Sequence, residues 1–394
     1  MRISCLIPKS MGIFSLAFLL VGSTAWAEPG FKGKEEALQD FLTHYVALGT
    51  PGILLHVTTA EGSVWQGGAG LADLQHNTPM TPNLQFRMGS NTKSFVAALI
   101  LQLQAEGRLS LDDTLEQWLP GAIPNGAAIS IRQLLNMTSG IFDYTWDEEV
   151  INAMLWMLTT GETPDWNLEE MVAIAAAQPP LFEPGQGWSY SNTNYVLLGM
   201  IARQITGTDP AHELARRFCQ PLGLADTLFN PGPPFSKPYV HGYLDIDEDG
   251  QWDDVGLYDP LFVSTAGDGI STLADMVVWL RALITGAVLD SASMAELFHT
   301  VPMPTNPEDP TSYSYGTGIL RAQFSDLGSD QPVVAYGHTG FVPGYWSVML
   351  HYPEASLTAV CMVNGNGDYV DSIIEDLTRL LHALPSASPL SLHL

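Results

Sequence analysis

The pattern of apolar and polar residues predicts a helix, two strands and a second helix in the first part of the chain. Apolar residues recur every three or four positions over residues 34–48, as on one face of an amphipathic helix. Residues 52–59 and 63–67 are typical of strands. Residues 95–106 form a strongly helical run.

The pattern changes toward the end of the chain. The middle of the chain contains three signals for the start of a helix. In each, a capping residue is followed three positions later by a residue that completes the cap, namely Ser130 with Gln133, Asn167 with Glu170, and Thr272 with Asp275. Four β-rich runs joined by Gly, Pro, Asn and Asp turns then cover residues 313–321, 333–339, 345–351 and 357–363, before a last helix over 371–384.

Strands at both ends of the chain and helices between them predict an α/β (α+β) fold. The expected architecture is one antiparallel sheet built from both chain ends and flanked by helices, with an inserted, mostly helical lobe. We assign residues 28–88 and 262–394 to the sheet domain and residues 89–261 to the lobe. Together they are expected to form one catalytic unit.

Residues 1–27 are predicted to be a signal peptide. Arg2 and Lys9 precede a short apolar run, and Ala25-Trp26-Ala27 places small residues at the positions that signal peptidase requires. The run is too short to span a bilayer. We therefore expect a periplasmic or secreted protein without a stable membrane anchor.

Composition narrows the classes of partner. The chain has 42 acidic and 15 basic residues, a formal net charge of −27. Nucleic acids and anionic membranes attract clustered Lys and Arg, so neither is an expected partner. Cys219 and Cys361 are the cysteines beyond the signal segment. Buried free thiols are favoured for both, and a single disulfide is the alternative.

No cofactor is expected, because neither a phosphate-binding loop nor a dinucleotide fingerprint follows a predicted strand. One acidic loop resembles the start of a calcium loop, with Asp245, Asp247 and Asp249 at alternate positions and Asp253 at the ninth. Gly256 stands at the twelfth position, where a bidentate Glu is expected. A solvated acidic loop is therefore favoured over a calcium site.

The clearest candidate for chemistry is a serine followed three residues later by a lysine. Ser90 and Lys93 stand at the start of the helical run, where residues i and i+3 share a face. Burial disfavours the charged form of a lysine, which would let Lys93 act as a base toward Ser90. Such a pair is common by chance, and a capping serine beside a surface lysine is the alternative.

Two further segments supply matching chemistry. In Tyr190-Ser191-Asn192 the phenol can relay protons and the amide can hold a substrate carbonyl. Gly337-His338-Thr339-Gly340 ends an apolar strand run, where a strand edge can pair with an extended substrate.

These three motifs, in this order, resemble those of the penicillin-recognising serine hydrolases, which share S-x-x-K, Y-x-N or S-x-N, and K/H-T-G. The chain is most similar to the branch that holds class C β-lactamases, family VIII esterases, D-aminopeptidases and soluble D-alanyl-D-alanine carboxypeptidases. The resemblance covers nearly the whole chain after the signal segment. It implies a β-lactamase/transpeptidase-like fold.

The resemblance also implies catalytic roles. Ser90 would attack a carbonyl and become acylated, and Lys93 would take its proton. Tyr190 would carry the proton to the leaving group and later help to activate water. Asn192 would position the substrate amide.

The third motif would bind the substrate. His338 and Thr339 would hold its carboxylate side, beside Gly340, and the N–H groups of Ser90 and Phe341 would form the oxyanion hole. His338 replaces the commoner lysine, so carboxylate binding would weaken as the pH rises. Arg321 is a further candidate to hold a substrate carboxylate, with a surface strand arginine as the alternative.

We therefore predict a serine hydrolase that acts on D-amino-acid peptides, like a D-alanyl-D-alanine carboxypeptidase. A family VIII-type carboxylesterase or a class C-like β-lactamase is the alternative with the same machinery, so the partner is a small peptide, ester or β-lactam. An inactive relative that binds peptidoglycan fragments is the non-enzyme alternative. The oligomeric state is left open.

Overall fold

The computed structural model describes most of the chain after residue 30, namely residues 31–164, 167–229, 235, 237–256, 258, 262–304, 311–327, 331–365 and 370–383. The predicted signal peptide lies outside the described residues. None of the helices among them combines the length and the apolar character that crossing a membrane requires.

An antiparallel sheet joins the two ends of the chain. Within the described residues it has nine strands, in the order β3-β2-β1-β13-β12-β11-β10-β9-β8. The last of the described strands lies beside the first, with Ile53 opposite Val363. The strands are β1 (Gly52–Thr58), β2 (Val64–Asp73), β3 (Thr78–Pro79), β8 (Val301–Pro302), β9 (Thr311–Tyr315), β10 (Leu320–Phe324), β11 (Val333–Val342), β12 (Tyr345–Tyr352) and β13 (Leu357–Val363).

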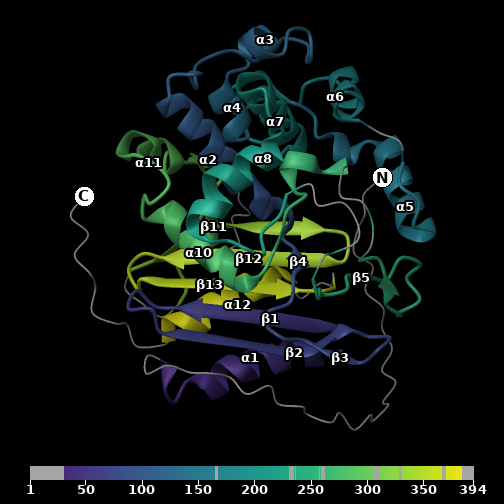
Figure 1. Ribbon diagram of the computed structural model, residues 1–394, viewed down its shortest axis with the longest axis vertical. Coiled ribbons are helices and arrows are strands. Elements are labelled where there is room, and N and C mark those ends of the chain that lie inside the picture. The colour runs from purple at the N-terminus through teal and green to yellow at the C-terminus, as the bar shows by residue number, and fades with distance from the viewer. Residues whose placement is uncertain are drawn as a thin grey trace.

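Helices cover both faces of this sheet (Figure 1). α1 (Glu35–Ala47) and α12 (Val370–Ala383) pack on one face over a buried apolar cluster. α10 (Leu273–Ile284) packs against β1, β12 and β13 from the other face. There the sheet shares a larger apolar core with α2 (Thr92–Ala105) and α7 (Asn192–Thr206).

The middle of the chain supplies the remaining helices and some short strands. The helices are α3 (Leu115–Trp118), α4 (Ile131–Leu135), α5 (Glu148–Thr160), α6 (Leu168–Ala177), α8 (Pro210–Leu214), α9 (Gln220–Leu222) and α11 (Ser291–Leu297). The short strands pair as β4 (Phe86–Arg87) with β7 (Ile270–Ser271), and β5 (Tyr243–Leu244) with β6 (Asp253–Asp254). The predicted fold class is confirmed, whereas the domain limits at residues 89 and 262 stay a prediction.

The predicted helix starts are confirmed by their hydrogen bonds. The Ser130 hydroxyl accepts from the Gln133 N–H before α4, and the Asn167 side chain accepts from the Glu170 N–H before α6. The hydroxyl of Thr272 accepts a third bond of this kind before α10. These side chains satisfy N–H groups that a helix leaves without partners in its first turn.

One strand prediction is wrong. Residues 313–321 were expected as a single strand, but they belong to β9 and β10, which pair as an antiparallel hairpin. The chain reverses between them, where the Gly316 N–H bonds to the Ile319 carbonyl. Gly318 has a φ of +67°, a left-handed conformation that glycine adopts without a Cβ clash. Cys219 and Cys361, the cysteines among the described residues, are buried free thiols, as predicted.

Candidate active site

Ser90 lies in a tight turn between β4 and α2. This turn, the 3₁₀ segment η2 (Gly89–Asn91), is fixed through the carbonyl of Met88, which accepts from Asn91 Nδ2 at 3.0 Å and from Ser347 Oγ at 3.1 Å. Gly89 has a φ of +54°, which favours glycine. The Ser90 side chain is therefore held in place at the N-terminal end of a helix and stays partly accessible.

Lys93 is fully buried, and its amine is surrounded by three oxygen atoms. Its Nζ lies 2.9 Å from Ser90 Oγ, 2.8 Å from Asn192 Oδ1 and 2.7 Å from the Ala266 carbonyl oxygen. Amide and backbone carbonyls only accept hydrogen bonds. The two N–H groups of a neutral lysine therefore go to Asn192 and Ala266, and its lone pair points at the Ser90 hydroxyl.

Burial also favours the neutral form of this lysine. Desolvation lowers the pKa of Lys93 to about 7, and the negative charge of Asp143 opposes that shift. A base is most effective when its pKa lies close to the working pH. The arrangement can thus remove a proton from Ser90 near neutrality.

Tyr190 lies next to both Lys93 and Ser90. The Lys93 Nζ lies 4.7 Å from the centre of the Tyr190 ring. The Tyr190 hydroxyl is buried without a hydrogen bond of ordinary geometry, and burial raises its pKa well above the usual value although Ser90 lowers it. A protonated phenol beside the nucleophile can pass a proton to a leaving group.

Asn192, the first residue of α7, has protein partners at both ends of its amide. Its Oδ1 accepts from Lys93, and its Nδ2 donates to Asp143 Oδ2 at 3.0 Å. A weaker contact of 3.3 Å joins Nδ2 to the Thr145 hydroxyl. The amide is therefore a link between Asp143 and Lys93 in this structure, whereas the sequence indicated a contact with substrate.

His338 in β11 faces the protein interior. Its Nδ1 lies 2.5 Å from the Thr339 carbonyl and its Nε2 lies 2.8 Å from the Tyr315 hydroxyl. Nδ1 therefore carries the proton, and Tyr315 donates to Nε2. Burial lowers the pKa of His338 to about 3, so the ring is neutral over the physiological range. The expected pH-dependent contact between His338 and a substrate carboxylate does not fit this position.

The backbone after His338 lies against the Ser90 turn. A Cβ on Gly340 would stand 1.9 Å from the Met88 carbonyl oxygen, and a Cβ on Gly89 would stand 2.7 Å from the Phe341 nitrogen. This contact brings the Phe341 amide next to the turn that carries Ser90. The Phe341 side chain is 57% exposed, and Thr339 is partly exposed beside it.

Arg321 lies one strand away, in β10 opposite Tyr336 of β11. Its guanidinium donates to Gln323 Oε1 at 2.9 Å and is partly buried. No hydrogen bond or ion pair among the described residues joins it to Ser90 or Lys93. Both interpretations of Arg321, a substrate contact or a structural strand arginine, stay open.

Two residues that contribute to the hydrogen-bond network around Lys93 were not identified from the sequence. Asp143, between α4 and α5, touches Asn192, and Ala266, in the 3₁₀ segment η7 (Ser264–Ala266), offers its carbonyl to Lys93. An aspartate in the otherwise apolar stretch 141–144 was a usable signal for the first. A backbone carbonyl leaves no signal in sequence.

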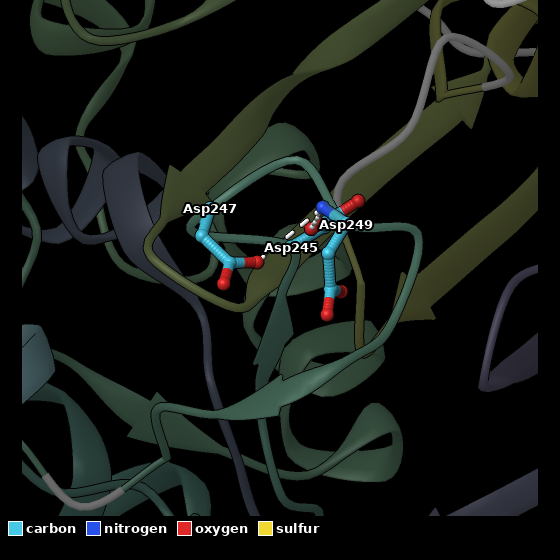
Figure 2. A group of neighbouring side chains, drawn as sticks. All are labelled: Asp245, Asp247 and Asp249. Carbon is cyan, nitrogen blue, oxygen red and sulfur yellow. Dashed lines mark hydrogen bonds between the residues drawn. The ribbon is translucent and has the colours of Figure 1, made fainter.

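The acidic loop after β5 brings three carboxylates together. One oxygen from each of Asp245, Asp247 and Asp249 lies within 4.8 Å of the others, and the Asp249 N–H donates to Asp245 and Asp247 (Figure 2). Asp253, the fourth candidate, accepts from the Ile246 N–H at 3.1 Å. Such exposed loops are common without an ion, so calcium stays the alternative proposal. Isothermal titration with Ca²⁺ separates the two interpretations.

Comparisons with known proteins agree with this geometry. Residues 38–384 match the family model described as "Beta-lactamase". "Penicillin-binding protein 4*" of Bacillus subtilis (strain 168) is 27% identical over 350 residues, which cover 84% of this chain and 73% of that protein. "Protein flp" of Staphylococcus aureus (strain MRSA252) is 26% identical over 79% of this chain and 58% of its own length.

Two solved structures have the same fold. A D-stereospecific amidohydrolase from Streptomyces sp. superposes with a TM-score of 0.77 at 32% identity, over 87% of this chain and 98% of that chain. The D-amino acid amidase of Ochrobactrum anthropi SV3, complexed with L-phenylalanine, gives a TM-score of 0.77 at 29% identity, over 88% and 98% of the two chains.

Proposed function

The chain belongs to the β-lactamase family of penicillin-recognising serine hydrolases, and from that premise we propose that it hydrolyses D-amino-acid peptides through an acyl-enzyme, as a D-alanyl-D-alanine carboxypeptidase does. The observation that carries the proposal is the buried Lys93 amine, whose carbonyl partners leave its lone pair directed at Ser90 Oγ. A serine needs such a base to become a nucleophile near neutral pH.

The reaction follows from this arrangement in two stages. Ser90 Oγ attacks the substrate carbonyl while its proton moves to Lys93, and Tyr190 delivers a proton to the leaving amine. The N–H groups of Ser90 and Phe341 would stabilise the oxyanion. A water molecule then attacks the acyl-enzyme by the reverse proton path, which releases the acid and restores the Ser90 hydroxyl.

The preference for D-amino-acid substrates is supported by the neighbours, since one similar structure is a D-stereospecific amidohydrolase and the other is a D-amino acid amidase. A carboxylesterase or a β-lactamase would use the same side chains of Ser90, Lys93 and Tyr190 and is the alternative. Acting on a cell-wall peptide would place the protein in the periplasm or outside the cell.

We expect kcat/KM for this hydrolysis to rise with pH through about 7, the pKa of Lys93. The base must be neutral to accept the Ser90 proton, so activity should fall about tenfold per pH unit below that midpoint. His338 is neutral throughout this range and adds no second transition. Initial rates between pH 5 and 9 test this, and a flat profile below pH 7 would contradict it.

Substrate class is tested by turnover of three compounds side by side. A D-alanyl-D-alanine peptide should be hydrolysed with the highest kcat/KM, ahead of p-nitrophenyl butyrate and nitrocefin. Faster turnover of the ester or of nitrocefin would replace the proposed peptidase by the corresponding alternative. An absence of all three activities, together with no covalent adduct after penicillin treatment, would favour an inactive binding protein.

A further inference from the structure

We propose that Asp143 is a positioning residue for this reaction, which fixes the amide of Asn192 and through it the direction of the Lys93 amine. The inference rests on the proposed serine hydrolysis and extends it to a residue outside the three sequence motifs. Asp143 touches neither Ser90 nor the expected substrate atoms, so it would act through Asn192.

Asp143 is a buried carboxylate with hydrogen-bond donors on both oxygens. It is 3% exposed and comes immediately before the 3₁₀ segment η4 (Tyr144–Trp146). Its Oδ1 accepts from the Thr145 N–H at 3.1 Å and from the Thr145 hydroxyl at 2.9 Å. Its Oδ2 accepts from Asn192 Nδ2 at 3.0 Å. These bonds hold both carboxylate oxygens in place.

The carboxylate determines which way the Asn192 amide faces. Burial raises the pKa of Asp143, whereas the hydrogen bonds from Asn192 and Thr145 and the charge of Lys93 oppose that shift and favour the ionised form. An ionised carboxylate only accepts hydrogen bonds, so the NH₂ group of Asn192 must lie toward Asp143 and its oxygen toward Lys93. In the reversed orientation the NH₂ group would face Lys93 and donate to the lysine lone pair. That lone pair would then no longer be directed at Ser90, and the base would be lost.

The charge of Asp143 acts on the same lysine. Lys93 is also faced by the rings of Tyr190 and Tyr195, whose phenols burial keeps protonated, and by the neutral His338. Among the described residues, Asp143 is therefore the negative group that acts on Lys93, and it raises the pKa of Lys93 against the effect of burial. Removing this charge should make Lys93 lose its proton at a lower pH.

The test is the pH profile of Asp143→Asn, which keeps the size of the side chain and removes the charge. We expect the rising limb of kcat/KM to move to lower pH by about one unit, the scale of a nearby buried charge. The plateau should fall by about tenfold or more, because the substituted amide can both donate and accept and no longer enforces one orientation of Asn192. KM should change little.

Asp143→Glu separates charge from position. The glutamate keeps the negative charge, so the rising limb of kcat/KM should stay at the wild-type pH. The displaced carboxylate should lower the plateau of kcat/KM. Asp275→Asn is the matched control, since this partly buried carboxylate also accepts from a backbone N–H and a threonine hydroxyl, those of Asp226 and Thr227. It should leave both limb and plateau unchanged. Thermal unfolding curves establish that each variant is folded.

A second readout does not depend on turnover. Titration of Lys93 followed by ¹³C NMR of its Cε carbon should show the same shift in Asp143→Asn, even if wild-type activity on every chosen substrate is absent. If the proposed function is wrong, the wild-type protein will be inactive. If the role of Asp143 is wrong, the Lys93 titration will be the same in Asp143→Asn as in the wild type. A kcat/KM plateau at the wild-type level in Asp143→Glu would also contradict the positioning role of Asp143.

Discussion

Replacement of Ser90 by alanine is expected to lower kcat by a factor of about 10⁵ to 10⁶. The variant lacks the oxygen that forms the acyl-enzyme, so the covalent route is closed, and only substrate binding and oxyanion stabilisation remain. Turnover of the best substrate measures the loss. Mass spectrometry after penicillin treatment should show an adduct on the wild-type protein and none on Ser90→Ala.

Ser94→Ala is the matched control for this experiment. Ser94 is a buried serine in the first turn of α2, four residues after Ser90, and its hydroxyl donates to the Asn91 carbonyl and accepts from Trp279 Nε1. Its loss should affect stability and leave the penicillin adduct in place. Unchanged hydrolysis in Ser90→Ala would show that another residue is the nucleophile.

Gly340→Ala is expected to have a large effect on both stability and activity. The added Cβ would stand 1.9 Å from the Met88 carbonyl oxygen and 2.8 Å from Asn91 Nδ2. Both groups belong to the rigid turn that carries Ser90, so β11 must move away. We expect a loss of about 3 kcal/mol in the free energy of unfolding. Moving the Phe341 N–H should lower kcat by about 10² to 10³.

Urea denaturation and turnover at saturating substrate measure these two effects. Gly126→Ala is the control, because the nearest atom to its new Cβ is the flexible end of Glu116, at 3.2 Å. It should change neither quantity strongly. Full activity in Gly340→Ala would mean that the contact between β11 and the Ser90 turn is unimportant for catalysis.

Much of the fold could be predicted because its signals are local. Capping side chains bond within three residues of themselves, as Ser130 and Asn167 do, and therefore appear in sequence as fixed spacings. The hairpin of β9 and β10 was missed because one strand was extended across Gly316 and Gly318, where the chain reverses. Two glycines one residue apart are a local turn signal, so the residue types within this run did indicate the reversal of the chain.

The candidate site also has features that the sequence predicted and features that it did not. The pair of Ser90 and Lys93 was predictable, since a spacing of three residues on a helix brings the two side chains together, and the structure places them 2.9 Å apart. The environment of His338 was not, because its neutrality depends on burial beside Tyr315, a residue from a different strand.

The sequence by itself determined which candidate reactive groups the chain offers, the helical start that brings Ser90 to Lys93, and most of the strands and helices that hold them. Only the tertiary structure decided how those groups behave. The pKa of Lys93 and the direction of its lone pair depend on desolvation and on acceptors from Asn192, Ala266 and, through Asn192, Asp143. These residues are far apart along the chain, and no local pattern records that folding places them around one nitrogen atom.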